Sequence, residues 1–187
     1  AIKEVQFQIR KLKMQFEQNM AEKLNNESPI WPWLIEYAAQ IIHTFKIHKE
    51  GQRSSRQRIR ADPSVPEIPK FGEHINFKPA KTVLLAKDEP KWRSGIWLGF
   101  IDHTSEHIMG TSKGTVKCRA IKWNDASDQF NAKTIEEMKG TPWRPVPGRD
   151  SLKIPTNICE NGTVLDENGK QDGYAVLRHR KVLRQSG

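Results

Sequence analysis

The catalytic pattern that stands out in the sequence is a pair of histidines with a glutamate beside the second one. His103, Glu106 and His107 match the H-x-x-E-H spacing, in which two histidines bind a metal ion and the glutamate assists the metal-bound water. That chemistry needs both histidines on one face of a helix. The segment lies between Gly99 and Gly110, with β-branched and aromatic residues on either side. It is therefore predicted to be a turn between strands, and we expect no metal site.

A second candidate chemistry is phosphate binding, because the chain carries 31 Lys and Arg against 22 acids, a net charge of +9. Such a surplus attracts polyanions, although a basic domain without such a partner has the same composition. Residues 46–60 hold six cations and the single acid Glu50. This run is either a solvated face or a phosphate-contacting surface. The residues expected to contact DNA are Lys3, Lys46, Lys49, Arg53, Arg56, Arg58, Arg60, Lys78, Lys91, Arg93, Lys117 and Arg119.

The chain also has six tryptophans, whose rings could stack on nucleic-acid bases. Trp31 and Trp33 fit the core of a helix, and Trp92, Trp97 and Trp123 lie in or beside predicted strands, where the core interpretation is favoured over base stacking. Residues 142–145 have the PxxP form that partner domains bind. Packing or spacing is the favoured role of this proline-rich segment.

Two amphipathic helices are predicted to precede the strands. Apolar residues recur at three- and four-residue steps from Ile2 to Leu24, which indicates one long helix ended by the two asparagines that follow. Ser28 and Pro29 then begin a second helix whose apolar face holds Trp31, Leu34, Ile35, Ala38, Ile42 and Phe45. A hairpin of two such helices leaves one side of each uncovered, so part of its core is expected to come from elsewhere.

The period changes to two after a proline-rich linker, which predicts four or five short antiparallel strands in a small barrel. Ser112, Lys113 and Gly114 are typical of a hairpin turn. The fold class is therefore α+β. The expected parts are a helical segment (1–60), a linker (61–70), a small β-barrel (71–125), a short helix with a proline-rich segment (126–148) and a basic tail with a possible hairpin (149–187).

Two distant cysteines, Cys118 and Cys159, provide neither a disulfide framework nor a zinc site and favour a reducing compartment. No apolar run reaches about 18 residues and no signal peptide is seen, so an intracellular protein, nuclear or cytoplasmic and without membrane contact, is expected. The first helix begins without a capping residue. We therefore expect a piece of a longer polypeptide.

Three stretches in this order resemble the second half of the integrase in copia-type retrotransposon polyproteins. They are residues 33–51, which begin with the W-x-x-x-x-A-A-like pattern from Trp33, then Phe71-Gly72-Glu73, and then Lys91-Trp92 with Gly95-Ile96-Trp97-Leu98-Gly99. The resemblance covers residues 1–147, and residues 140–148 look like an ending found in some members. Ser55 departs from the family, which has proline there.

The resemblance implies the end of an RNase H-like catalytic core followed by an SH3-like barrel. In that family three carboxylates hold two Mg²⁺ or Mn²⁺ ions, and all three would lie before Ala1, with Glu4 matching a downstream acid instead. We therefore expect a fragment that is not an enzyme by itself, needs no cofactor, and contributes non-specific DNA binding to DNA integration. Its expected partners are DNA, the rest of the integrase core and a second copy through the first helix. The alternative function is a chromatin- or protein-binding adaptor that uses the barrel and the proline-rich segment.

Overall fold

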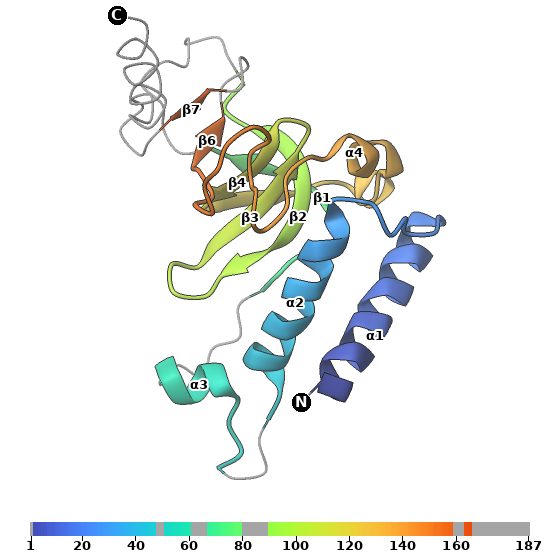
Figure 1. The fold of residues 1–187 in the computed structure, drawn as a ribbon, viewed down its shortest axis with the longest axis vertical. Helices are drawn as coiled ribbons and strands as arrows, with labels where there is room; N and C mark the ends of the chain where they lie inside the picture. Colours follow the sequence, from blue (N-terminus) through green and yellow to red (C-terminus); the bar gives the residue numbers. More distant parts are fainter. Residues whose placement is uncertain (1, 48–50, 61–66, 80–89, 159–162, 166–187) are drawn as a thin grey trace, which may run out of the picture.

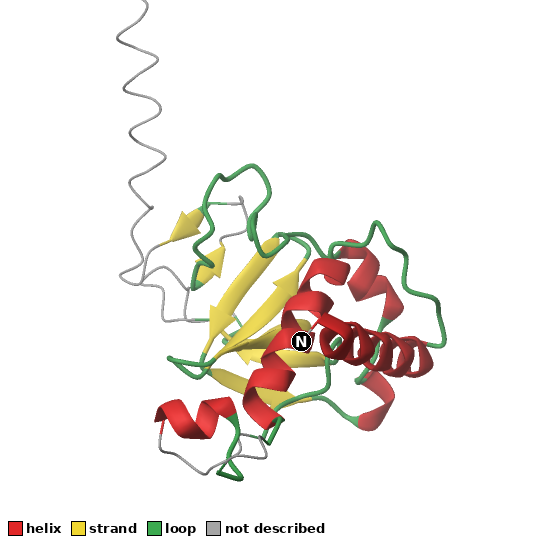
Figure 2. Cartoon of the chain, turned by 60° about the horizontal axis from the view of Figure 1, so that its bottom comes forward, coloured by secondary structure: helices red, strands yellow, loops and turns green. Residues whose placement is uncertain are grey.

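A computed structural model describes residues 2–47, 51–60, 67–79, 90–158 and 163–165. The chain is α+β, as the sequence predicts, with α1 and α2 side by side and α2 packed against an antiparallel sheet (Figures 1 and 2). Its elements are α1 (Ile2–Met20), α2 (Ile30–Phe45), α3 (Ser55–Arg60), β1 (His74–Lys78), β2 (Arg93–Ile101), β3 (Glu106–Thr111), β4 (Gly114–Cys118), β5 (Ala120–Trp123), a 3₁₀ turn (Ala126–Asp128), α4 (Ala132–Glu137), β6 (Asn157–Ile158) and β7 (Val164–Leu165).

The five long strands form one sheet in the order β4-β3-β2-β1-β5. The two edge strands are consecutive in the chain, with only Arg119 between them. In a flat sheet of five strands the edges would lie about 19 Å apart, whereas Cys118 and Ala120 are at most about 7 Å apart along the chain. The sheet must therefore curl strongly, and the register shift between Trp97 and Gly99 on β2 marks one bend.

The sequence predicts a small barrel, but the sheet is not closed into one, since no ladder joins β4 to β5 among the described residues. One continuous segment supplies both edges, pairing with β3 through its first half and with β1 through its second half. Because β4 and β5 follow one another along this segment, they do not form a ladder with each other. The outer edge of β4 is covered instead by irregular chain, because Thr115 N donates to Pro145 O and Lys117 N donates to Pro155 O.

The helices and the sheet share one core at the start of the sheet. Tyr37 of α2 stacks on Phe71, with ring centroids 5.3 Å apart, and meets Trp97 of β2 edge-on at 5.2 Å. Phe16 of α1 lies 6.1 Å from Phe71 and is only 3% exposed. The second half of the α1 stripe is thus covered by this chain's own residues, although the sequence suggested that its burial needed a sheet outside the chain.

The first half of α1 is less covered, and its exposed apolar residues include Ile2 and Phe7. On α2 the buried face differs from the predicted one, because Ile35 and Phe45 are exposed whereas Trp33 and Tyr37 are buried. The reason is that α2 contacts both α1 and β2, so its covered surface is wider than one helical stripe and is turned toward the sheet.

The region after β5 contains the short helix predicted there, as α4, and a separate 3₁₀ turn precedes it. The first turn of α4 is capped by Asn131, whose side chain accepts from Thr134 N at 3.4 Å. The proline-rich segment that follows contains a tight turn, in which Thr141 and Arg144 exchange two backbone hydrogen bonds of 3.0 Å. Pro145 and Val146 then pack into the domain. The predicted final strand of the tail lies outside the described residues.

Candidate nucleic-acid interface

The H-x-x-E-H segment forms the turn between β2 and β3, as predicted, and not a helix. Glu106 binds Thr104 Oγ1 at 2.9 Å, Lys117 Nζ at 3.5 Å and Arg119 Nε at 3.3 Å. Burial by itself would raise the pKa of Glu106, but the Thr104 hydrogen bond and the two cations together hold that pKa below its usual value. In the described ranges no group of three or more His, Cys, Asp or Glu residues is placed to hold a metal ion.

His107 has a structural contact in place of a metal. Its Nδ1 lies 3.2 Å from Trp97 Nε1 and accepts a hydrogen bond from that indole. Burial lowers the pKa of His107, which favours the neutral imidazole that this bond requires. The histidine therefore satisfies the polar edge of a fully buried tryptophan.

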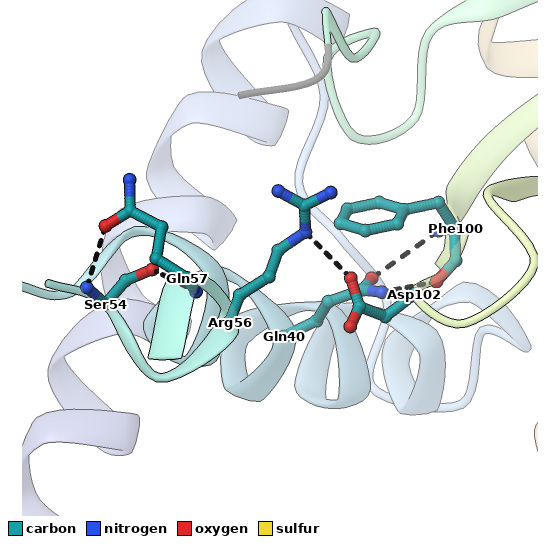
Figure 3. Close-up of polar contacts among 6 residues, drawn as sticks. All are labelled: Gln40, Ser54, Arg56, Gln57, Phe100 and Asp102. Atoms are coloured by element: carbon teal, nitrogen blue, oxygen red, sulfur yellow. Dashed lines mark hydrogen bonds and ion pairs between the residues drawn. The ribbon is translucent and has the colours of Figure 1, made fainter. Parts of the chain in front are cut away.

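Several of the predicted DNA contacts are occupied by carboxylates of the same chain. Arg56 on α3 is the clearest case, because its side chain is 7% exposed and its Nε lies 2.9 Å from Asp102 Oδ1 (Figure 3). Ser54 and Gln57 fix the start of α3 by a reciprocal capping box: Gln57 N donates to Ser54 Oγ, and Ser54 N donates to Gln57 Oε1. Arg56 therefore ties α3 to the β2–β3 turn.

A residue of α2 also contacts the end of β2, next to Asp102. The side-chain amide of Gln40 donates to the Phe100 carbonyl oxygen and accepts from Phe100 N at 3.5 Å (Figure 3). Ser55, which departs from the family's proline, is the first residue of α3. Ser54, directly before it, supplies the cap, because its Oγ accepts from Gln57 N.

Three further predicted cations have similar partners. Lys46 Nζ lies 2.7 Å from Glu4 Oε2, and Lys117 and Arg119 share Glu106. Lys46 and Arg119 are nevertheless exposed, as are the predicted residues Lys3, Arg53, Arg58, Lys78 and Lys91. Lys49 and the side chain of Arg60 lie outside the described part.

The ladder register brings several cations together at one end of the sheet. Phe77 on β1 pairs with Arg93 on β2, so Lys78 follows at the point where Lys91 and Trp92 lead into β2. The turn between β3 and β4 carries Lys113 to the same end, because the start of β2 lies beside the end of β3.

Trp92 and Lys113 line a hollow that we call the Trp92 groove, whereas Lys78 and Lys91 are chain neighbours of its lining residues. It has a volume of about 420 Å³, and its polar and aromatic lining includes Trp92, Arg93, Ser94, Ser112, Lys113 and Asn157. None of the described residues that line it is acidic. Trp92 is 41% exposed. The groove therefore combines cations, hydroxyl groups and an exposed aromatic ring.

Arg93 differs from Arg56 in its partners. It is half-buried, and its Nη1 donates to Asn157 Oδ1 at 3.0 Å and to the Ile158 carbonyl at 3.1 Å. Both acceptors are neutral, and within the described part of the chain no carboxylate pairs with Arg93 or Lys113. Among the described residues, then, no carboxylate offsets the positive charge of Arg93 and Lys113, and such cations attract anions.

Sequence reasoning missed two members of this groove. Lys113 was seen only as part of a turn, and Trp92 was favoured as a core residue. Trp33 and Trp97 are buried as expected, but Trp92, Trp123 and Trp143 are exposed. The available signal was the position of Trp92 between two cations at the start of a strand, where a side chain often lies at the rim of the sheet.

Comparisons with family models, with curated proteins and with solved structures give no match to this chain. No helix in the described residues is both long enough and apolar enough to cross a membrane.

Proposed function

We propose that this chain is part of a copia-type retrotransposon integrase and contributes sequence-independent contacts to the DNA backbone. The observation that carries the proposal is the Trp92 groove, where Arg93 and Lys113 have no carboxylate partner in the described residues and Lys78 and Lys91 are exposed nearby. Phosphate contacts of this kind position a protein on DNA without reading its sequence. The order of a helical hairpin before a small sheet agrees with what the resemblance implies.

The curled sheet is proposed to be an incompletely closed, SH3-like barrel. Its support is the strand order, in which both edges belong to one segment interrupted at Arg119. Catalysis is proposed to belong to the intact integrase, whose Mg²⁺- or Mn²⁺-binding carboxylates would lie outside this chain. Action on DNA would take place in the nucleus or the cytoplasm.

DNA affinity should fall steeply with salt if these cations contact phosphates. For four to six contacts, log K is expected to decrease with log salt at a slope of roughly −4 to −5, because each contact releases counterions. Fluorescence anisotropy with a labelled duplex between about 50 and 200 mM salt measures this slope. Replacing Lys78 and Lys91 by glutamine should make it shallower by about 2.

The matched control removes the same charge from α1, by Arg10→Gln with Lys11→Gln. Both residues are exposed on the helix, whereas Lys78 and Lys91 are chain neighbours of Phe77 and Trp92, which line the groove. These changes should leave the slope nearly unaltered. Equal effects of the two double variants would mean that net charge, not the groove end of the sheet, determines binding.

The exposed start of α1 is proposed as the surface that meets the rest of the integrase core. Ile2 and Phe7 are exposed there, and Val5 and Ile9 are half-buried. In the isolated chain the same patch should cause self-association, since exposed apolar patches favour interfaces. Sedimentation velocity should show dimers or larger species that Phe7→Lys disperses and Arg10→Gln does not. A monomer at high concentration would contradict this proposal.

A further inference from the structure

We infer that the Trp92 groove binds an unpaired nucleotide, so that single-stranded DNA is its preferred ligand. This inference rests on the proposed function and names the form of DNA that the groove takes. Its starting point is the exposed ring of Trp92 beside two cations that have no described carboxylate partner. Contacts to the backbone of duplex DNA involve the cations but not the Trp92 ring.

The aromatic ring is the part of the site that selects for a single strand. In a duplex each base is stacked between its neighbours, so its face is not open to a protein side chain. An unpaired base can lie on a tryptophan ring, which contributes about 1–3 kcal/mol per base. Trp92 is exposed at the groove, directly before β2, whereas Trp97, five residues later and within β2, is fully buried.

The size and lining of the groove agree with one nucleotide. Its volume of about 420 Å³ falls within the range of about 300–1,000 Å³ that is usual for small-molecule sites. Ser94 and Ser112 line it beside Trp92, and their hydroxyl groups can donate to or accept from a base edge or a sugar. The ring, the hydroxyl groups and the cations thus match the base, the sugar and the phosphate.

Arg93 is oriented for the phosphate. Both of its hydrogen bonds leave from Nη1, which fixes the guanidinium against β6. A guanidinium presents its N–H groups in a rigid fork, so fixing one nitrogen also fixes the edge formed by Nε and Nη2. Lys113, from the β3–β4 turn, adds a second charge to the same groove. An acidic peptide would satisfy these cations but would leave the Trp92 ring without a partner.

The test compares a labelled oligothymidylate of about 12 nucleotides with a duplex of the same length by anisotropy. Trp92→Ala should weaken single-strand binding about 5- to 100-fold, which corresponds to the loss of one stacked base. Trp92→Phe, which keeps a ring, should retain most of the affinity. Duplex binding should change by less than about twofold in both variants, because no phosphate contact is removed.

The control is Trp143→Ala, since Trp143 is 62% exposed but does not line the groove. It should bind both ligands like the unaltered chain. Arg93→Gln should weaken both ligands and reduce the single-strand salt slope by about 0.7. Thermal unfolding of each variant verifies that the fold is retained.

Two outcomes would overturn the inference: Trp92→Ala leaves single-strand binding unaltered, or it weakens both ligands equally. Displacement of the oligothymidylate by a phosphoserine peptide at equal concentration would also overturn it. Salt-dependent duplex binding without any Trp92 effect would leave the proposed function standing. Single-strand binding that depends on Trp92, with no duplex binding, would support the inference and contradict the proposed contact with duplex DNA.

Discussion

Replacing Phe16 by alanine should lower the free energy of unfolding by about 3–5 kcal/mol, the usual loss for a large aromatic side chain in a core. Phe16 is almost fully buried, and its ring lies against Phe71 and Gly72 at the joint between the helices and the sheet. Its removal opens a cavity in the contact that holds α1 to the rest of the chain. Urea unfolding followed by helical circular dichroism and by tryptophan fluorescence measures the loss.

Phe7→Ala is the matched control, because it removes the same side chain from the same helix. Phe7 is 56% exposed, and its ring lies 4.7 Å from Lys11 Nζ. The expected loss is below about 1 kcal/mol, in the range for surface changes and a solvent-exposed cation–π contact. If both variants lost the same small amount, α1 would not be part of the core described above. Separate transitions for the two signals would mean that the helices and the sheet unfold independently.

The local elements could be predicted from the sequence because their signals are local. The period of α1, the proline at the start of α2 and the alternation of β1 each depend on neighbours within a few residues. The hairpin turn at residues 112–113 is confirmed between β3 and β4 for the same reason. The α+β class follows from the order of these elements.

The tertiary arrangement was less predictable, because it depends on contacts between distant residues. The buried face of α2 is set by Phe71 and Trp97, which no helical period reveals. The sequence did not show whether the predicted barrel closes, since a pattern of strands does not reveal that one segment supplies both edges. The sequence analysis expected part of the core of the helical hairpin to come from outside the chain. In the structure Phe71 and Gly72 of the same chain cover Phe16.

The candidate interface was predicted only in part, because charge in a sequence does not reveal ion pairing. Arg56 binds an acid 46 residues away, Lys46 one 42 residues away and Arg119 one 13 residues away. In the sequence each of these cations looks free to bind DNA, and only the fold shows the carboxylate that pairs with it. Arg93 was included with them, yet its acceptors are neutral groups 64 and 65 residues away.

Gly72→Ala should destabilise the fold by about 2–4 kcal/mol, through two separate causes. The backbone of Gly72 has φ of +81°, a left-handed conformation that costs a residue with a Cβ about 1–2 kcal/mol. A Cβ there would also lie 2.4 Å from Phe16 Cε2, so the aromatic ring must move within a packed core. Gly148→Ala is the matched control, because φ is +77° and nothing lies within 4 Å of its added Cβ. It should cost only the backbone part.

Combining Gly72→Ala with Phe16→Ala separates the two causes. The cavity left by Phe16 gives the new methyl group room, so only the backbone cost should be added to the loss from Phe16→Ala. The double variant should therefore be more stable than the sum of the single losses predicts, by about 1–3 kcal/mol. The same combination with Gly148→Ala should be additive, because that residue meets no side chain. Additive losses for Gly72 and Phe16 would mean that the two do not touch, and the joint between α1 and the start of the sheet would have to be placed elsewhere.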